Sequence, residues 1–312
     1  MCTSICSGHH YNPGSHLNLS TRSNNFLQSS MLKIALPNKG ALSDGALRLV
    51  QEAGYHCDRS KRDLLVRDIS NDVEFYFLRP RDIAIYVSNG VLDLGITGRD
   101  LALDSRAEVD ELLSLNFGRA KFCYAVPRET DLTPENFAGL RIATSYRNLV
   151  EDDLEKRNID AQVVHLDGAV EIAIKMGVAD AVADVVQTGR TLEQAGLEPT
   201  GEPILDTEAV LIARNGRAQS GNLARLFVER VQGILLGREY VMVEYDIEKK
   251  YLARASEITP GIESPTVAPL SKEGWVAVKA MAREKNVNHI LDELSALGAK
   301  GIIITEIRTC RI

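Results

Sequence analysis

The sequence has few cysteines, no excess of positive charge and no apolar run long enough to cross a membrane. The five cysteines are odd in number and widely scattered, and no two form a CxxC pair, so we expect neither a disulfide framework nor a structural zinc site. The formal net charge of −7 disfavours a surface that binds nucleic acid by neutralising its phosphates. These absences predict a protein of the reducing cytoplasm, in which any anionic ligand would have to bind in a pocket.

The sequence also lacks the signature of a catalytic protein nucleophile. Its six histidines do not stand at the spacing of a Ser-His-Asp or Cys-His arrangement. Near the N-terminus, Cys2, Cys6, His9 and His10 lack a second ligand pair at zinc-finger spacing, and we favour a solvated tail over a metal site. This inventory suits a reaction that depends on positioning and charge stabilisation.

The composition, 45% hydrophobic and 25% charged over 312 residues, is typical of a globular protein with two or three domains. Residues 1–30 are rich in Ser, Asn, His and Gly. They have neither an apolar signal-peptide core nor a periodic pattern, so we expect a disordered N-terminal extension.

From Met31 onward, short apolar runs alternate with amphipathic stretches, as in LKIALP followed by LSDGALRLVQEAG. This alternation is typical of a parallel or mixed α/β sheet. A second series begins near AKFCYAV, and within it we expect a helix at GAVEIAIKMG. We predict two α/β lobes, residues 31–120 and 121–213, with the stretch 214–239 completing the first. Ligands of such folds gather at the carboxyl ends of strands, so the site should lie between the lobes.

Residues 240–312 change character. Their apolar runs and periodic stretches follow the order βαββαβ, which is the order of the ferredoxin-like split unit. We therefore predict a separate C-terminal domain.

The stretch ADAVADVVQTGRTL, residues 179–192, predicts a phosphate-binding turn at the end of a buried strand. Asp184 stands near the strand end, where an acceptor suits a sugar diol or its Mg²⁺. The turn offers backbone amides, two hydroxyls and a cation, a combination that cradles a phosphomonoester. Its residues are Thr188, Gly189, Arg190 and Thr191. The alternative is an ordinary loop with Asp184 as a helix cap, because short glycine motifs also occur by chance.

Other strand ends carry further donors for anions and a ring that could stack on a base. They are Lys39, Arg79, Arg81, Arg99, Asp100 and Tyr146. The alternatives are a solvated turn for the lysine, surface ion pairs for the arginines and a ring packed beneath its loop for the tyrosine.

Six blocks between Met31 and Ile312 resemble, in order, the ATP phosphoribosyltransferase family. The blocks are ALPNKGALS, FLRPRDIAIYV, LDLGITGRDL, RIATSYRNLV, LDGAVE and GVADAVADVVQTGRTL. The resemblance implies a two-lobed core like that of the type II periplasmic binding proteins and, in the long form of the family, a C-terminal regulatory domain that binds histidine. Arg147 departs from the family, which usually has proline in the corresponding YPNL.

The resemblance also implies a glycosyltransferase, specifically a pentosyltransferase. It would condense ATP, through N1, with phosphoribosyl pyrophosphate to phosphoribosyl-ATP and pyrophosphate, the committed step of histidine biosynthesis. Mg²⁺ would be the cofactor and histidine a feedback inhibitor, and the family usually forms a hexamer built of dimers. Which residues bind the metal directly is left open.

Carried over by motif, the turn after Asp184 would take the 5-phosphate, with Asp184 at the ribose hydroxyls and Asp167 and Glu171 near the ribose or the metal. No side chain would form a covalent intermediate.

On the other side of the site, Lys39 and Arg79 would face the pyrophosphate or the ATP phosphates. Arg99 and Asp100 would line the first lobe, and Tyr146 would contact adenine.

In the C-terminal domain, the resemblance implies a histidine site. Its residues would be Asp246, Ile262, Ser264, Thr266 and Gly301.

Two other functions remain as alternatives. One is a non-catalytic solute receptor of the same two-lobed fold, since fold alone does not give function. The other is a metabolite-sensing regulator of another protein.

Overall fold

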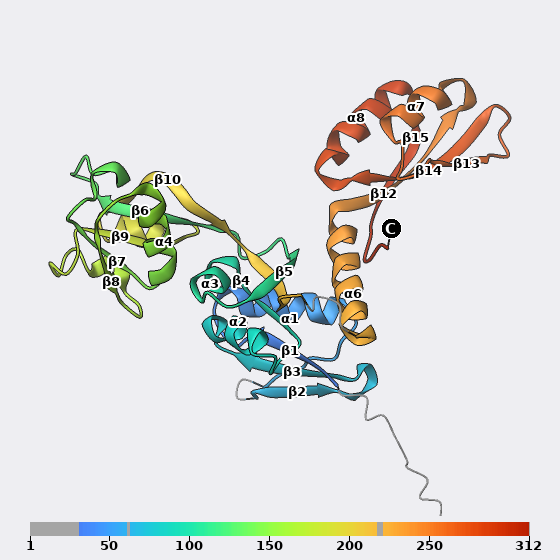
Figure 1. The fold of residues 1–312 in the computed structure, drawn as a ribbon. Coiled ribbons are helices and arrows are strands. Elements are labelled where there is room, and N and C mark those ends of the chain that lie inside the picture. Colours follow the sequence, from blue (N-terminus) through green and yellow to red (C-terminus); the bar gives the residue numbers. More distant parts are fainter. Residues whose placement is uncertain (1–30, 61–62, 217–220, 312) are drawn as a thin grey trace, which may run out of the picture. The chain divides into compact units, whose positions relative to one another are not determined.

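The computed structural model describes residues 31–60, 63–216 and 221–311. The predicted disordered extension, residues 1–30, lies outside this part of the chain. The described residues form three sheets with their helices (Figure 1). No helix among them is both long enough and apolar enough to span a membrane.

The first lobe is built on a six-stranded mixed sheet in the order β2-β3-β1-β4-β11-β5. Its strands are β1 (Leu32–Pro37), β2 (Leu65–Asp68), β3 (Val73–Leu78), β4 (Leu94–Gly98), β5 (Val109–Ser114) and β11 (Ala209–Arg214). Its helices are α1 (Ala41–Glu52), α2 (Pro80–Ser88), α3 (Arg99–Asp104) and α6 (Asn222–Glu239), with the 3₁₀ turn η1 (Ile69–Asn71).

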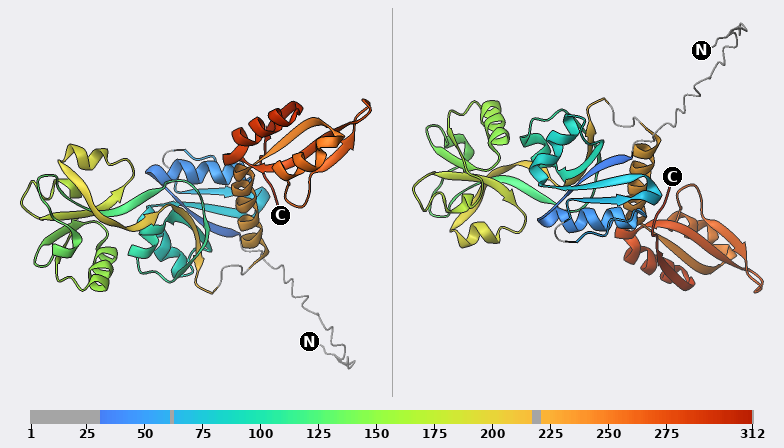
Figure 2. Two further views of the ribbon diagram at one scale, coloured as in Figure 1. Left: turned by 90° about the horizontal axis from the view of Figure 1, so that it is seen from above. Right: turned by 90° about the horizontal axis from the view of Figure 1, so that it is seen from below.

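The central strand β1 is buried on both faces, which explains its continuous apolar run. One face packs in a core with Leu49 of α1 and Phe227 of α6, and the other in a core with Ile83 of α2. Figure 2 shows α6 beside this sheet in both views. Because β1, β3 and β4 are parallel, the loops after them lie at one edge of the sheet.

The second lobe has a five-stranded sheet in the order β10-β6-β9-β7-β8. Its strands are β6 (Ala120–Pro127), β7 (Arg141–Thr144), β8 (Gln162–His165), β9 (Ala181–Val186) and β10 (Leu197–Thr207). Its helical elements are α4 (Arg147–Arg157), α5 (Arg190–Gln194), η2 (Pro134–Asn136) and η3 (Val170–Ile172). The chain enters this lobe through β6 and leaves through the antiparallel β10, so two crossing segments join the lobes. This is the architecture of the type II periplasmic binding proteins, as expected.

Two expectations differ from the observed structure. The stretch 168–177 forms only the short 3₁₀ helix η3, because Ala169 adopts a left-handed conformation with φ 52° and the β-branched residues that follow favour helix weakly. Strand β11 lies between β4 and β5 of the first sheet, whereas the sequence predicts a second lobe that extends to residue 213 and so includes most of this strand. Backbone pairing with both neighbours therefore returns the chain to the first lobe earlier than expected.

The C-terminal domain has the predicted βαββαβ order. Its elements are β12 (Tyr240–Glu248), η4 (Lys249–Tyr251), α7 (Leu252–Ile258), β13 (Thr266–Pro269), β14 (Trp275–Arg283), η5 (Glu284–Asn286), α8 (Val287–Leu297) and β15 (Lys300–Glu306). The antiparallel sheet, in the order β13-β14-β12-β15, is ferredoxin-like, with α7 and α8 on one face (Figure 1). Burial alternates along β12, and Val243 and Tyr245 point into the core.

After β15, the chain runs back along α6 (Figure 1). The amide of Cys310 donates a hydrogen bond of 2.9 Å to the carbonyl oxygen of Gly233. A Cβ atom on Gly237 would lie 2.7 Å from the carbonyl oxygen of Ile307, so this close approach requires glycine. Helix α6 therefore contacts both ends of the C-terminal domain, through its junction with β12 and through this returning segment.

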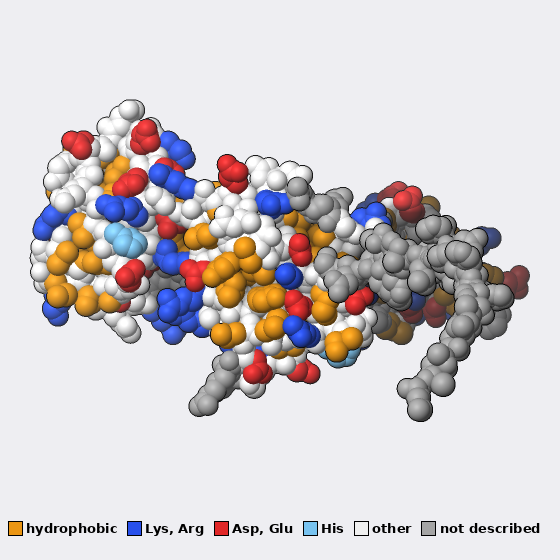
Figure 3. All heavy atoms as spheres, turned by 60° about the horizontal axis from the view of Figure 1, so that its bottom comes forward, with side chains coloured by type: hydrophobic (Ala, Val, Ile, Leu, Met, Phe, Trp, Pro, Cys, Tyr) orange, Lys and Arg blue, Asp and Glu red, His pale blue; other side chains and the backbone are white. Residues whose placement is uncertain are grey.

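On the face in Figure 3, Lys and Arg side chains are interspersed with Asp and Glu side chains, and hydrophobic side chains gather over the first lobe. No continuous basic surface is seen on the described part of this face.

Candidate active site

The predicted phosphate turn follows the central strand β9, which pairs with β6 and β7. Gly189 has φ 76°, a left-handed conformation that turns the chain into α5 at Arg190. The side chains of Thr188, Arg190 and Thr191 are exposed and make no hydrogen bond or ion pair within the described residues. The turn therefore presents two hydroxyls and a guanidinium to a ligand.

Asp184 lies two residues before the end of β9 and is partly buried. Its Oδ1 accepts a hydrogen bond of 2.8 Å from the amide of Val185. Burial raises the pKa of Asp184, and the nearby charges of Glu171 and Asp100 raise it further, while Arg81 opposes them. The positive charge near Asp184 therefore does not offset the effect of its burial on the pKa. A carboxylate in this environment is suited to bind a cationic centre or a metal ion.

Asp100 and Tyr146, predicted separately, lie together near Asp184. Burial raises the pKa of Tyr146, and the charge and hydrogen bonding of Asp100 add to this rise. The ring of Tyr146 packs with Phe122, with centroids 5.0 Å apart, and beneath the guanidinium of Arg81, 4.4 Å from the ring centroid. The tyrosine is therefore packed under its loop, and its contact with adenine stays a prediction.

Lys39 and Arg79 follow the paired strands β1 and β3, so their loops are neighbours. Both side chains are exposed and make no side-chain hydrogen bond or ion pair among the described residues. Beside them, Oδ1 of Asn38 is buried and has no hydrogen-bond partner in the described chain. A ligand that donates to this oxygen would satisfy it.

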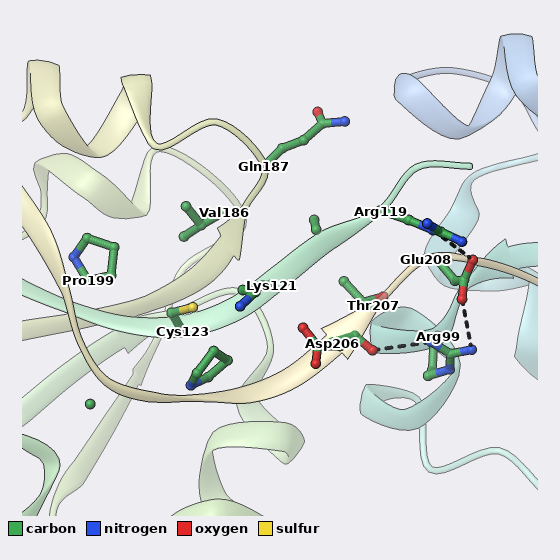
Figure 4. A pocket seen from close by; sticks show the side chains of 13 residues that line it. Arg99, Arg119, Lys121, Cys123, Val186, Gln187, Pro199, Asp206, Thr207 and Glu208 are labelled. Carbon is green, nitrogen blue, oxygen red and sulfur yellow. Dashed lines mark hydrogen bonds and ion pairs between the residues drawn. The ribbon is translucent and has the colours of Figure 1, made fainter. Parts of the chain in front are cut away.

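Arg99 is held by carboxylates. Its guanidinium lies 2.7 Å from Glu111 and 3.5 Å from Glu208, and hydrogen bonding to Glu111 raises the pKa of Arg99. It lines a cavity of about 630 Å³ beside the crossing strands. Figure 4 shows Arg99 and Arg119 both directed at Glu208, with Gln187 on the loop after β9.

The cavity contains residues that the motifs did not indicate. They are Arg119, Lys121, Cys123, Gln187, Asp206, Thr207 and Glu208. Most lie on the two crossing segments, whose meeting depends on pairing between β6 and β10 and leaves no local pattern in the sequence.

Of the two carboxylates predicted beside Asp184, Glu171 contributes to its raised pKa. Asp167 is fully exposed and lies 3.5 Å from Nε2 of His165.

The predicted histidine-site residues divide into two groups. Asp246 on β12 pairs with Lys300 of β15 and so lies beside Gly301. Thr266 lies on the edge strand β13, beyond β14, and Ile262 and Ser264 precede it. Within one chain, strand β14 therefore lies between the two groups.

Comparison with known proteins gives consistent matches along the chain. Residues 79–233 match the family model "ATP phosphoribosyltransferase" and residues 237–309 match the model "HisG, C-terminal domain". The ATP phosphoribosyltransferase of Salinibacter ruber is 61% identical over 283 residues, which are 90% of this chain and 100% of that protein. That of Corynebacterium diphtheriae is 55% identical over 282 residues, with the same coverages.

Among solved structures, a chain of the ATP phosphoribosyl transferase (HisG:HisZ) complex from Thermotoga maritima aligns with a TM-score of 0.58 and 25% identity. The alignment covers 66% of this chain and 99% of that chain. The curated relatives extend the match through the ferredoxin-like domain. The chain therefore belongs to the ATP phosphoribosyltransferase family, in the long form that carries a C-terminal domain.

Proposed function

We propose that this pentosyltransferase joins N1 of ATP to C1′ of phosphoribosyl pyrophosphate in the cytoplasm, releasing pyrophosphate in the first step of histidine biosynthesis. One observation carries the proposal. The exposed donors of the turn after Asp184 have no partners within the described residues, in a chain that is 61% identical over 283 residues to an ATP phosphoribosyltransferase.

The turn would hold the 5-phosphate of the sugar. The hydroxyls of Thr188 and Thr191, the guanidinium of Arg190 and the amides after Gly189 can donate to phosphate oxygens. These contacts fix one end of the substrate and are the same in the ground and transition states. They therefore supply binding and orientation rather than rate.

The rate enhancement would come from charge. As the bond between C1′ and pyrophosphate breaks, positive charge grows on the ribose and negative charge on the leaving group. Asp184, whose carboxylate is partly buried and has few compensating cations, would bind the ribose hydroxyls and stabilise this positive charge. Lys39 and Arg79, at neighbouring strand ends, would receive the pyrophosphate.

Mg²⁺ would enter with the pyrophosphate. No group of three or more His, Cys, Asp or Glu side chains in the described part of the chain could hold a metal ion. Asp184 and Glu171 nevertheless supply two neighbouring carboxylates, and Mg²⁺ is commonly held by one or two carboxylates together with substrate phosphates. When bound, it would neutralise charge on the leaving group.

ATP would lie on the side of the site formed by the first lobe. Asp100 of the first lobe, with Tyr146 of the second lobe beside it, marks one candidate position for adenine. The cavity lined by Arg99 and Lys121 is a second candidate, because its volume of about 630 Å³ is typical of small-molecule sites.

The test is a pyrophosphate-release assay with ATP, phosphoribosyl pyrophosphate and Mg²⁺. Omission of either substrate should abolish release, and Asp184→Asn should lower kcat strongly. A folded protein that binds both substrates without turnover would support the alternative of a non-catalytic binding protein of the same fold.

The C-terminal domain would bind histidine as a feedback inhibitor. Within one chain β14 lies between Asp246 and Thr266, so the two groups would come together more readily if different copies supplied them. This favours regulation in a homo-oligomer, from dimer to hexamer. Histidine should inhibit the wild type and not Asp246→Asn, while both keep their uninhibited rate. Turnover indifferent to histidine would overturn the regulatory proposal alone.

A further inference from the structure

Helix α4 of the second lobe has no N-terminal cap from its own lobe. Its N-cap residue, Tyr146, offers no side-chain acceptor to the first-turn amides. The two neighbouring hydroxyls are used elsewhere: Thr144 Oγ1 accepts from the amide of Tyr146, and Ser145 Oγ accepts from Arg81. The first amides of an isolated α4 would therefore lack a protein partner.

The cap comes from the first lobe. Oδ1 of Asp104, at the end of α3, accepts from the amide of Asn148 at 3.0 Å and from the amide of Leu149 at 3.2 Å. The side-chain amide of Asn148 donates back to the carbonyl oxygen of Asp104 at 2.6 Å. The Asp104 side chain is only 12% exposed, so the negative charge lies in a mostly dry position at the positive end of α4.

Arg81 completes this junction. It pairs with Oδ2 of Asp104 at 3.2 Å, donates to Ser145 Oγ at 2.9 Å and lies over the ring of Tyr146. One carboxylate thus accepts from two amides of the second lobe and a guanidinium of the first. Both acceptor oxygens of Asp104 are used, as a mostly buried carboxylate requires.

A second ion pair crosses the same boundary and serves as a comparison. Arg106 pairs with Asp152 of α4, but these side chains are 53% and 40% exposed. Exposed pairs contribute little to stability. Of these two ion-paired carboxylates, Asp104 should therefore contribute more to the contact between α3 and α4, to which Leu101 of α3 adds apolar packing in the core that contains Val150 and Leu154 of α4.

We propose that Asp104 is a positioning residue which, by capping α4 across the lobe boundary, fixes the spacing between Asp184 and the side of the site formed by Arg81 and Asp100. The effect of Asp104 on catalysis rests on the proposed function, whereas the capping of α4 by Asp104 is independent of that function. Arg81 and Asp100 belong to the first lobe and lie close enough to Asp184 to influence its pKa. A ribose held by the second lobe would meet these groups only at a fixed lobe spacing.

The test uses the full chain and three variants: Asp104→Ala, Asp104→Asn and the matched control Asp152→Ala. Hydrogen exchange resolved at the first turn of α4 reports the cap directly. In Asp104→Ala, the amides of Asn148 and Leu149 should exchange roughly five- to thirtyfold faster, the range expected for loss of a cap. The Asn variant keeps an acceptor and should restore much of the protection, and Asp152→Ala should exchange like the wild type.

Kinetics report positioning. Asp104→Ala should lower kcat by about 100-fold, the effect of a small misplacement at a reacting centre, with a much smaller change in KM for phosphoribosyl pyrophosphate. The Asn variant should recover part of kcat. Far-UV circular dichroism that matches the wild type would show that the variants remain folded.

Three outcomes overturn part of this account. Unchanged exchange at Asn148 and Leu149 in Asp104→Ala would contradict the cap. Faster exchange with an unchanged kcat, or an equal loss in Asp152→Ala, would contradict the positioning role. A wild type that binds both substrates without turnover would defeat the proposed function, while the exchange result would still decide whether Asp104 caps α4.

Discussion

The hydroxyl of Thr207 donates a hydrogen bond of 2.6 Å to Oδ1 of Asp100, and both residues are buried. The bond joins the end of the crossing strand β10 to the first turn of α3. It also holds the carboxylate that raises the pKa of Tyr146. A single hydroxyl thus links the segment that connects the lobes with the packed side chains of the proposed site.

Replacing Thr207 by Val should destabilise the protein. The substitution keeps the shape but removes the Thr207 donor from the buried carboxylate of Asp100, which costs about 1–3 kcal/mol. Urea denaturation would measure this loss. Thr130→Val is a matched control, because Thr130 donates to the carbonyl oxygen of Pro127 in a partly exposed turn, where water can replace the hydroxyl. Equal losses in the two variants would contradict a special role for the bond.

Replacing Thr188 and Thr191 by Ala should weaken binding of phosphoribosyl pyrophosphate by about 1–3 kcal/mol for each hydroxyl that donates to the charged phosphate. Replacement by Ser should preserve binding, because the hydroxyl remains. Isothermal titration with each substrate would separate the effects. A comparable loss for ATP would mean that the turn does not hold the 5-phosphate.

Asp184→Asn should be more stable than the wild type at neutral pH. Burial, Glu171 and Asp100 raise the pKa of Asp184, so between the ordinary and the raised pKa the folded state holds a proton that the unfolded state has released. Ionisation therefore destabilises the wild type as the pH rises through the raised pKa. The advantage of the Asn variant should shrink as the pH falls toward the ordinary value of 3.8. Unfolding free energies of both proteins, measured from the ordinary pKa of 3.8 up to neutral pH, would test this. A constant difference would count against the burial of this charge.

Asp68 should have the opposite effect, because its ionised form stabilises the folded protein. Burial by itself would raise the pKa of Asp68, but hydrogen bonds from Ser70, the His56 amide and Asn71 lower it to about 2. Its contribution, about 2 kcal/mol, is present above the ordinary value of 3.8 and is lost as the pH falls toward 2. Acid unfolding of Asp68→Asn should lack this component. Ser70→Ala, which removes one donor, should lose only part of it.

Gly237→Ala should loosen the returning C-terminal segment. Alanine favours helix by about 1 kcal/mol over glycine, but its methyl group would meet the backbone at Ile307, and overpacking of this kind costs about 1–3 kcal/mol. We expect a net loss of stability and faster amide exchange at Cys310. Gln232→Ala, at an exposed position of α6, should leave both unchanged. A more stable Gly237→Ala variant would show that the contact adapts freely.

Local sequence determined much of this protein. The alternation of strands and helices from Met31 onward and the βαββαβ order of the C-terminal domain follow from apolar periodicity, which acts within a few residues, but periodicity did not indicate strands such as β5 and β10. The turn at Gly189 follows from backbone sterics, and its donors from residue type. The same local reasoning gave a helix at 168–177, where β-branched residues and the left-handed Ala169 permit only a short turn.

Only the tertiary structure decided which distant side chains meet. Asp104 caps a helix that begins more than 40 residues later, and Thr207 reaches Asp100 across 107 residues. Motifs indicated Asp100, Tyr146 and Asp184 one by one, but not that they share an environment. Periodicity specifies which face of an element is buried and not what it is buried against. That partner depends on the sheet order and on the two crossing strands, which the whole chain sets together.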